Sequence, residues 1–163
     1  MRRLKFIEKI KGYSDERIFI LDQKISYTYK ELVKSVSNKL LRIENEIPSK
    51  SVVVIRGDYS IDAIAWMFAL ALKKNIFIPI IPTNEAEFLK KKKVSKPNFE
   101  IDLSSDTISP LQYLNNREQK YNTLRKLNRS GLVLFSSGST GTPKAMIHDF
   151  DSLLSSYEKS IRL

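Results

Sequence analysis

The sequence predicts an α/β fold built on a mostly parallel sheet with flanking helices. Two apolar runs, residues 51–56 and 76–80, lack the alternation of a half-exposed strand, which is typical of parallel strands buried on both faces. A nearly all-apolar segment with a capping residue, Ser60, lies between them and predicts a helix over residues 61–73. Strand, helix and strand in this order imply a right-handed crossover and place the chain in the α/β class.

Length and composition indicate a single globular domain. The chain has 163 residues, 42% of them hydrophobic and 28% charged, and its longest apolar run contains Asp62. That run is too short to span a membrane, so we expect no membrane span and a cytoplasmic protein. With no cysteine and one histidine, the sequence excludes a disulfide framework, thiolate chemistry and an ordinary zinc site.

The net charge of +10 has two interpretations. It indicates either an anionic partner, such as nucleic acid or a membrane surface, or simply a lysine-rich composition. Four lysines at residues 90–93 close a predicted helix that begins with Glu85 and Glu87. Acids early and lysines late complement the helix dipole, so a solvated helix end is favoured over a binding patch. No interleaved aromatic residues support nucleic-acid binding.

The N-terminal part predicts a β-hairpin followed by a helix. Residues 17–21 and 24–27 form two short apolar strands around a turn. Thr28 and Glu31 have the spacing of a capping box, so a helix should run over residues 29–43. Its apolar face would carry Leu32, Val36, Leu40 and Ile43.

The remaining elements follow from apolar runs and turn residues. Pro79 and Pro82 predict that the strand over residues 76–80 ends near a sheet edge or a bulge. Further expected elements are a strand at 99–103, a polar loop at 102–114, a helix at 117–127, strands at 131–135 and 145–148, and a last helix to Ile161 capped by Asp151 or Ser152.

A loop of small hydroxyl residues and glycines follows the strand at 131–135 and closes on a lysine. Its candidate binding residues are Ser136, Ser137, Gly138, Ser139, Thr140, Gly141, Thr142 and Lys144. Glycines let the backbone approach an anion and take positive φ, and successive N–H groups can point into one concavity. Hydroxyl donors and a mobile positive charge add to such a site. The sequence therefore predicts a phosphate-binding loop at residues 136–144.

Two better-known phosphate loops do not fit this segment. A Walker A loop has its lysine directly after the second glycine, whereas here Pro143 intervenes and Ala145 follows the lysine. The dinucleotide fingerprint of three spaced glycines is absent. A plain surface turn rich in serine and glycine is the other interpretation, and a preceding buried strand with a Pro-Lys exit argues against it.

Residues 136–144 resemble the signature loop of the AMP-forming adenylating enzymes, a superfamily that includes acyl-CoA and aryl-CoA synthetases, adenylation domains of peptide synthetases and luciferase. The match is continuous, and Ala145 departs from it because the family has glycine there. Residues 25–32, 52–57 and 76–80 resemble earlier family segments in order and spacing.

The resemblance implies an ATP-dependent carboxylate:AMP ligase, which forms an acyl-adenylate and pyrophosphate with Mg²⁺ and passes the acyl group to coenzyme A or another thiol. Lys144 would contact the β- and γ-phosphates. The family's adenine and acyl pockets, metal-site Glu and catalytic lysine lie further along than Leu163. We therefore expect residues 1–163 to be a single N-terminal subdomain fragment of an AMP-binding domain, with no catalytic residue or metal ligand. Such a fragment should be inactive alone. It should need a C-terminal portion or a complementary chain, or self-associate.

Two other functions stay open: a non-catalytic phosphate-binding or interaction module derived from such an enzyme, and a basic module for nucleic acid or anionic surfaces. Arg56 and Asp58 lie at the carboxyl end of a predicted strand, where α/β ligands collect, although a surface ion pair explains them more simply. His148 is a structural residue or lines the acyl-side cavity. Trp66, Met67 and Phe68 belong to the core.

Overall fold

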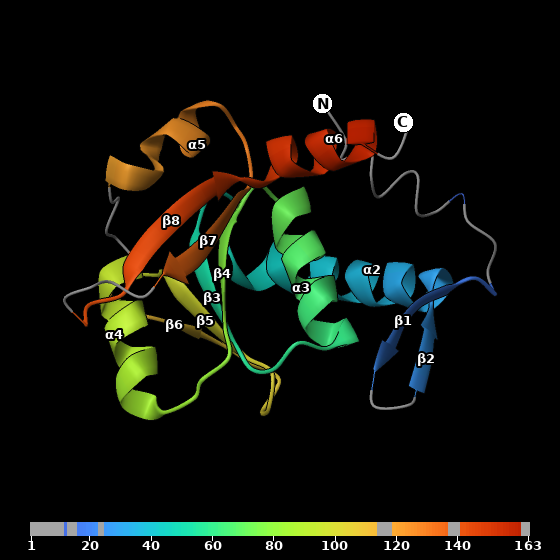
Figure 1. Ribbon diagram of the computed structural model, residues 1–163, viewed down its shortest axis with the longest axis horizontal. Coiled ribbons are helices and arrows are strands. Elements are labelled where there is room, and N and C mark those ends of the chain that lie inside the picture. Colours follow the sequence, from blue (N-terminus) through green and yellow to red (C-terminus); the bar gives the residue numbers. More distant parts are fainter. Residues whose placement is uncertain (1–11, 13–15, 23–24, 114–118, 137–140, 161–163) are drawn as a thin grey trace.

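The computed structural model describes residues 12, 16–22, 25–113, 119–136 and 141–160. They form a six-stranded mixed sheet with helices on both faces and a separate two-stranded hairpin (Figure 1). The strands are β1 (Ile18–Asp22), β2 (Ile25–Thr28), β3 (Val52–Arg56), β4 (Ile76–Ile80), β5 (Phe99–Asp102), β6 (Thr107–Pro110), β7 (Gly131–Ser136) and β8 (Lys144–Asp149). The helices are α2 (Tyr29–Glu46), α3 (Ile61–Leu72), α4 (Glu85–Ser95), the 3-10 turn η1 (Gln119–Tyr121), α5 (Asn122–Lys126) and α6 (Phe150–Ser160).

The sheet has the order β6-β5-β3-β4-β7-β8. Its four inner strands run parallel, while β6 and β8 pair antiparallel at the two edges. Together with the early hairpin, this arrangement confirms the predicted α/β class and the mostly parallel sheet.

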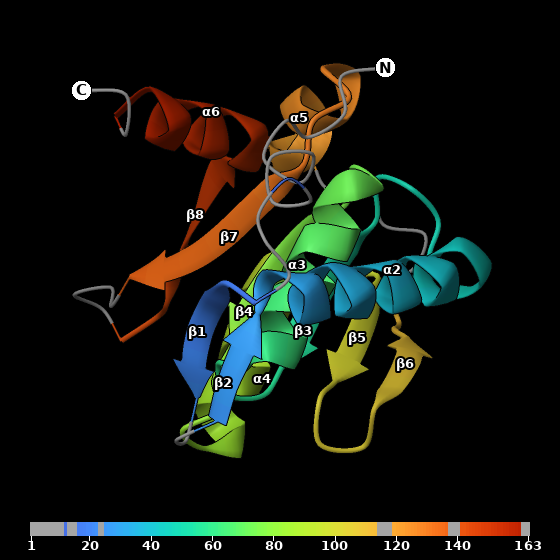
Figure 2. The ribbon, with the colours of Figure 1, turned by 90° about the vertical axis from the view of Figure 1, so that its right-hand side faces the viewer.

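Helices cover both faces of the sheet (Figures 1 and 2). On one face Val53 and Phe77 pack with residues of α2, α3 and α6, including Trp66. On the other face Val54 and Ile78 pack with residues of α4, η1 and α5. Successive strand residues point to opposite faces, so double coverage buries every residue of β3 from Val52 to Ile55 and explains the missing alternation in the sequence.

The hairpin and the helix after it form as predicted. The Thr28 hydroxyl accepts a hydrogen bond from the Glu31 N–H at 3.2 Å, and the Glu31 carboxylate accepts one from the Thr28 N–H at 2.7 Å. This capping box starts α2, which continues to Glu46, past the predicted end. Three of the four expected core residues of α2 are buried, and Leu40 is half-buried.

Two sequence predictions are wrong in detail. Residues 102–114 are not all loop, because Thr107–Pro110 forms the edge strand β6; this strand is largely exposed and carries only one apolar side chain, Ile108, so no apolar pattern marks it. Asp151 and Ser152 do not cap α6. The Asp149 carboxylate, directly before α6, accepts the Ser152 N–H at 3.0 Å instead. The predicted helix at 117–127 is η1 and α5 in its described part.

Pro79 lies in a central strand rather than near a sheet edge. β4 has β3 on one side and β7 on the other, but β7 pairs only with Ile76 and Phe77. The ladder between β4 and β7 therefore ends before Pro79. No hydrogen bond to β7 is lost through the missing N–H group of Pro79. A proline is therefore acceptable within this inner strand.

Candidate functional site

The predicted loop leaves the carboxyl edge of the parallel strands. β3, β4 and β7 run in the same direction, so their last residues, Arg56, Ile80 and Ser136, share one edge of the sheet. β8 runs back from this edge and pairs Lys144 with Ser136. Ligands of open α/β sheets collect outside this edge, so both ends of the loop stand where the fold favours a binding site.

Of the eight candidate residues, Ser136, Gly141, Thr142 and Lys144 are described, and Ser137, Gly138, Ser139 and Thr140 lie outside the described residues. Gly141 has a φ of +72°, and a Cβ built on it would meet nothing within 4 Å. Glycine is therefore favoured at this position for its left-handed backbone and not for lack of space. The positive φ predicted for this glycine is confirmed.

Lys144 begins β8 with an exposed side chain. To the residues that the structure describes, it makes no hydrogen bond or ion pair. Pro143, whose ring fixes φ, directly precedes it and stiffens the exit from the loop. The register of β7 and β8 places Lys144 at the end of the loop, across from Ser136.

A hollow of about 420 Å³ lies between α4 and the described ends of the loop. It is lined by Asn84, Ala86, Glu87, Lys90, Lys91, Phe135, Ser136, Gly141 and Pro143. The Asn84 side chain caps α4 by accepting the Glu87 N–H at 2.8 Å, so the helix starts beside the loop. Sequence reasoning treated the lysine run of α4 as a solvated helix end and did not place it near the loop.

The lysine run divides into paired and exposed side chains. Lys91 forms an ion pair with Glu87 at 2.6 Å, and Lys92 pairs with Glu100. Lys90 and Lys93 are exposed. The helix end is thus solvated in part, as predicted, but two of its lysines belong to local ion pairs.

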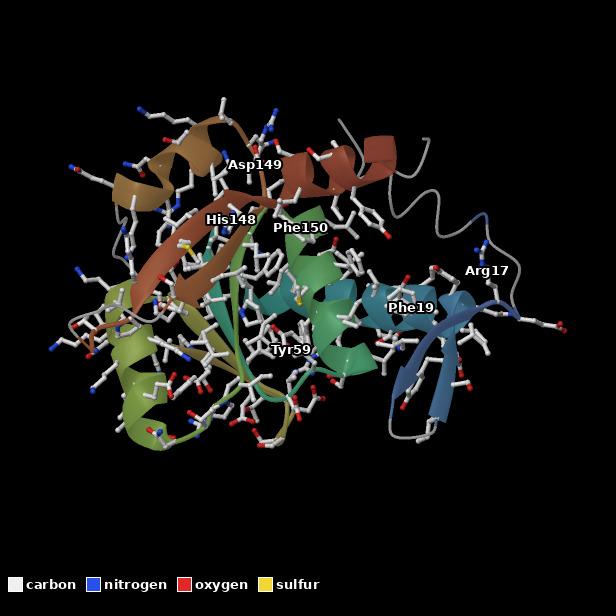
Figure 3. All side chains as sticks on the ribbon, in the orientation of Figure 1. Arg17, Phe19, Tyr59, His148, Asp149 and Phe150 are labelled. Carbon is white, nitrogen blue, oxygen red and sulfur yellow. The ribbon has the colours of Figure 1, made fainter. Side chains whose placement is uncertain are left out.

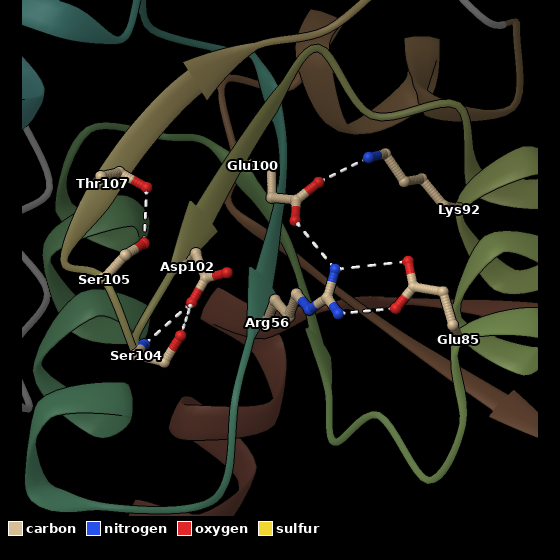
Figure 4. A network of polar contacts seen from close by, with 8 residues as sticks. All are labelled: Arg56, Glu85, Lys92, Glu100, Asp102, Ser104, Ser105 and Thr107. Carbon is tan, nitrogen blue, oxygen red and sulfur yellow. Dashed lines mark hydrogen bonds and ion pairs between the residues drawn. The ribbon is translucent and has the colours of Figure 1, made fainter.

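Arg56 belongs to a network that joins β3, α4 and β5 (Figure 4). Its guanidinium lies 2.6 Å from the Glu85 carboxylate, 3.8 Å from that of Glu100 and 4.4 Å from the centre of the Phe88 ring. Asp58 is not its partner. The simpler interpretation of Arg56, an ion pair, is therefore supported, with carboxylates that the sequence did not identify.

A second carboxylate at this edge is held by its own turn. The Ser104 hydroxyl and N–H both donate to Asp102, at 2.6 and 2.8 Å (Figure 4). The hydroxyl hydrogen bond is the main reason that the pKa of Asp102 lies below its usual value. The Asp102 carboxylate thus has its hydrogen-bond donors within the β5–β6 turn.

His148 lies at the far end of β8 from the loop, next to Asp149 and Phe150 (Figure 3). It pairs with Leu132, four residues along the strand from the Ser136–Lys144 pair, or about 13 Å at the rise of a strand. Its neighbour Phe150 is buried against Phe77 with ring centres 4.9 Å apart. The structure does not bring His148 together with the described residues of the loop.

The described residues hold neither a cluster of metal ligands nor a membrane-spanning helix. Within these residues no three histidine, aspartate or glutamate side chains converge as metal ligands. No helix among them is both long and apolar enough to cross a membrane.

In fold, the described residues are similar to part of the N-terminal subdomain of adenylation domains. The N-terminal subdomain of NpsA from Klebsiella oxytoca, in complex with 3-hydroxybenzoyl-AMSN, is 20% identical with a TM-score of 0.65 over 88% of this chain and 40% of that one. VinN in complex with 3-methylaspartate is 14% identical with a TM-score of 0.67 over 93% and 48%. NpsA-ThdA, an artificially fused adenylation-PCP di-domain, is 17% identical with a TM-score of 0.65 over 88% and 32%.

The chain thus spans less than half the length of these solved structures. No protein-family model matches the sequence, and no curated protein matches it. The likeness is one of fold, since the identities are 20% or lower.

Proposed function

We propose that residues 1–163 form the N-terminal part of an ATP-dependent carboxylate:AMP ligase, and that residues 136–144 bind the phosphates of ATP. One observation carries the proposal: a loop with the motif of the adenylating enzymes leaves the carboxyl edge of β7 in a fold shared with adenylation domains. The left-handed backbone of Gly141 fits an anion at this place, as does Lys144, which has no ion-pair partner in the part of the chain that the structure describes.

The loop would act by electrostatic stabilisation. In the proposed reaction a carboxylate oxygen attacks the α-phosphorus of ATP, the bond to the bridging oxygen breaks, and pyrophosphate leaves with increased negative charge. The Gly141 N–H, the Ser136 and Thr142 hydroxyls and the Lys144 ammonium group would donate to the phosphate oxygens as that charge develops. Ser137, Gly138, Ser139 and Thr140 complete the proposed site.

The other ligands of the proposed reaction would be bound outside residues 1–163. Mg²⁺ would accompany ATP and neutralise its phosphates. The adenine, the carboxylate and the thiol acceptor, coenzyme A or another, would be bound by a C-terminal portion or a complementary chain. The proposed protein is cytoplasmic, and residues 1–163 alone should show no acid-dependent exchange of pyrophosphate into ATP.

The test compares ATP affinity among three forms of the chain by isothermal titration calorimetry. Lys144→Ala should weaken ATP binding roughly tenfold or more, because it removes a charge-assisted hydrogen bond. Lys126→Ala, which changes an exposed lysine on α5, should leave the affinity unchanged and serves as the matched control.

Equal ATP affinity in Lys144→Ala and the wild type would assign Lys144 to the ordinary surface lysines. Failure of the wild type to bind ATP would count against the phosphate loop as a whole. Acid-dependent exchange by residues 1–163 alone would contradict the assignment of the other tasks to further parts.

A further inference from the structure

We infer that the basic corner of the molecule at α5 docks on the surface of an anionic lipid bilayer. The basic corner consists of Lys50, Lys120, Arg125, Lys126 and Leu127. The inference does not depend on the proposed function, because these residues belong neither to the loop nor to the hollow beside it.

Contacts between three segments of the chain form the basic corner. The Arg125 Nε group donates to the Lys50 carbonyl at 3.1 Å, which ties α5 to the connection before β3. The Lys120 ammonium group donates to the carbonyl of Val94, near the end of α4. The Tyr121 ring has the Lys120 Nζ atom 5.2 Å and the Arg125 Cζ atom 5.7 Å from its centre. The structure therefore gathers basic side chains that are up to 76 positions apart in the sequence.

The positive charge of this region exceeds what the end of a helix requires. Residues 119–131 carry four basic side chains and no acidic one, whereas a helix carboxyl end carries only about half a negative charge. Arg129 is neutralised by its ion pair with Asp149. The side chains of Lys50 and Lys126 are exposed and make no hydrogen bond or ion pair to the described residues. Their charge is available to an anionic surface.

An exposed apolar side chain lies among these cations. Leu127 directly follows Lys126 at the end of α5, and 59% of Leu127 is exposed. Basic side chains are attracted to anionic lipid headgroups, and an exposed leucine next to them can enter the boundary between headgroups and acyl chains. Peripheral attachment to a bilayer gains from both terms, and the basic corner supplies both.

Two other anionic partners fit the basic corner less well. The Tyr121 ring is fully buried, so it cannot stack on a base of a single-stranded nucleic acid. A duplex bound through its phosphates would leave Leu127 without a contact. Lysine is depleted in interfaces between proteins, whereas three of the four cations here are lysines. An anionic bilayer uses the lysines and the leucine together.

Docking at the basic corner leaves the predicted loop accessible. Helix α5 precedes β7 at the amino edge of the parallel strands, and the loop leaves the other end of β7 (Figure 1). β7 has six residues, which separate its two ends by about 17 Å. A bilayer that contacts α5 would therefore lie away from the edge of the sheet where ligands collect.

The experiment measures co-sedimentation of the wild-type chain with two kinds of vesicle. One kind is phosphatidylcholine alone, and the other also contains about 30% phosphatidylglycerol, which is anionic. The wild type should bind the anionic vesicles and not the neutral ones, and added salt should weaken this binding, because it screens the attraction between charges.

Two substitutions in the basic corner test the charge and the apolar contact separately. Lys50→Asn should weaken binding to the anionic vesicles about fivefold; asparagine accepts the left-handed backbone of this position, where φ is +66°. Leu127→Ser should weaken it about fivefold or more. The matched controls Lys34→Gln and Leu41→Ser change exposed side chains on α2 and should bind as the wild type does.

A spectroscopic variant reports insertion directly. In Leu127→Trp the added indole should shift its fluorescence emission to shorter wavelength when anionic vesicles are added, because it moves from water into the bilayer boundary. The natural tryptophan, Trp66, is fully buried and gives a constant background.

The inference is overturned if the wild type binds neutral and anionic vesicles alike or binds neither. It is also overturned if Leu127→Ser binds as Leu41→Ser does, or if the emission of Leu127→Trp does not shift. Tighter binding to a DNA duplex than to anionic vesicles, weakened by Lys50→Asn and unaffected by Leu127→Ser, would assign the basic corner to nucleic acid instead.

Discussion

The Asp149 carboxylate accepts three hydrogen bonds at the junction between β8 and α6. One carboxylate oxygen accepts the Ser152 N–H at 3.0 Å, and the other accepts the Ser152 hydroxyl at 2.9 Å and the Arg129 guanidinium. Burial raises the pKa of Asp149, but the combined hydrogen bonds from Ser152 and Arg129 outweigh it and leave the pKa below its usual value. The folded chain therefore favours the charged form of this side chain.

Asp149→Asn should lower the free energy of unfolding at neutral pH and make less difference in acid. Because the folded pKa lies below the unfolded value of about 3.9, the carboxylate stabilises the fold fully above that value. This contribution is lost as pH falls through the folded pKa. Urea denaturation of both proteins from pH 7 to pH 2 measures the difference, and a difference that stays constant or grows on acidification would refute the assignment.

Helix caps show what local sequence determines at the residue scale. The caps of α2 and α3, Thr28 and Ser60, were predicted because each is one suitable acceptor directly before an apolar helix. Asp149 was not predicted as the cap of α6, since Asp151 and Ser152 are equally good capping residues by type. Phe150 is the first residue of α6 and packs against Phe77, and this contact is not visible in the local sequence.

Among the elements, β7 is held close to α5 and β4 by a glycine. A Cβ on Gly131 would lie 2.6 Å from the Leu124 Cδ1 atom and 3.1 Å from the Ile76 Cγ1 atom. Leu124 and Ile76 are buried. The close approach of α5 to the start of β7 thus depends on the absence of a side chain at this position.

Gly131→Ala should lower the free energy of unfolding by about 1–3 kcal/mol, the usual cost of overpacking a core. In a Leu124→Ala background the same change should cost less, because its nearest neighbour is gone. Thermal or urea unfolding of the four proteins of this cycle gives the coupling. Equal costs of Gly131→Ala in both backgrounds would show that the Leu124 contact does not limit the packing.

The strands that are buried on both faces were predicted most directly, whereas the exposed edge strand β6 was missed. β3 and β4 are continuous apolar runs, and their place in the sheet follows from that pattern. β6 has no such run. β7 pairs with β4 only at Ile76 and Phe77, and no local pattern reports where this ladder ends, so Pro79 was predicted near a sheet edge or a bulge.

At the scale of the whole molecule, the sheet edge at β8 is open, and two apolar side chains beside it are exposed. Leu134 and Met146 are cross-strand partners, and they are 36% and 39% exposed. β8 is the last strand of the described sheet, so its outer backbone groups have no strand partner there. Unpaired edges and exposed apolar pairs favour association with another chain.

The chain should self-associate, or pair with a complementary chain, through this edge. Such an interface would bury roughly 1,000 Å² or more in total. Met146→Glu should reduce association in sedimentation at micromolar concentration, whereas Leu41→Glu, at an exposed position on α2, should not. A monomeric wild-type chain, or equal effects of the two changes, would contradict this expectation.

The location of the loop could be predicted from sequence, but the surroundings of the site could not. Residues 136–144 were identified by their own residue types, and β7 was expected directly before them. Lys90 lines the same hollow as the ends of the loop, and Arg56 forms an ion pair with Glu85. Both arrangements depend on how α4 packs against the sheet. These contacts join residues that are 29 or more positions apart, so no local pattern reports them.

Mapping of amide chemical shifts during titration with ATP decides whether the loop is a phosphate site. We predict that the largest shifts fall on the loop and its described ends, Ser136, Gly141, Thr142 and Lys144, with smaller shifts at the start of α4. Helix α2, on the other face of the sheet, serves as the internal control. Shifts confined to elements away from residues 136–144, or no shifts at saturating ATP, would contradict the proposed function.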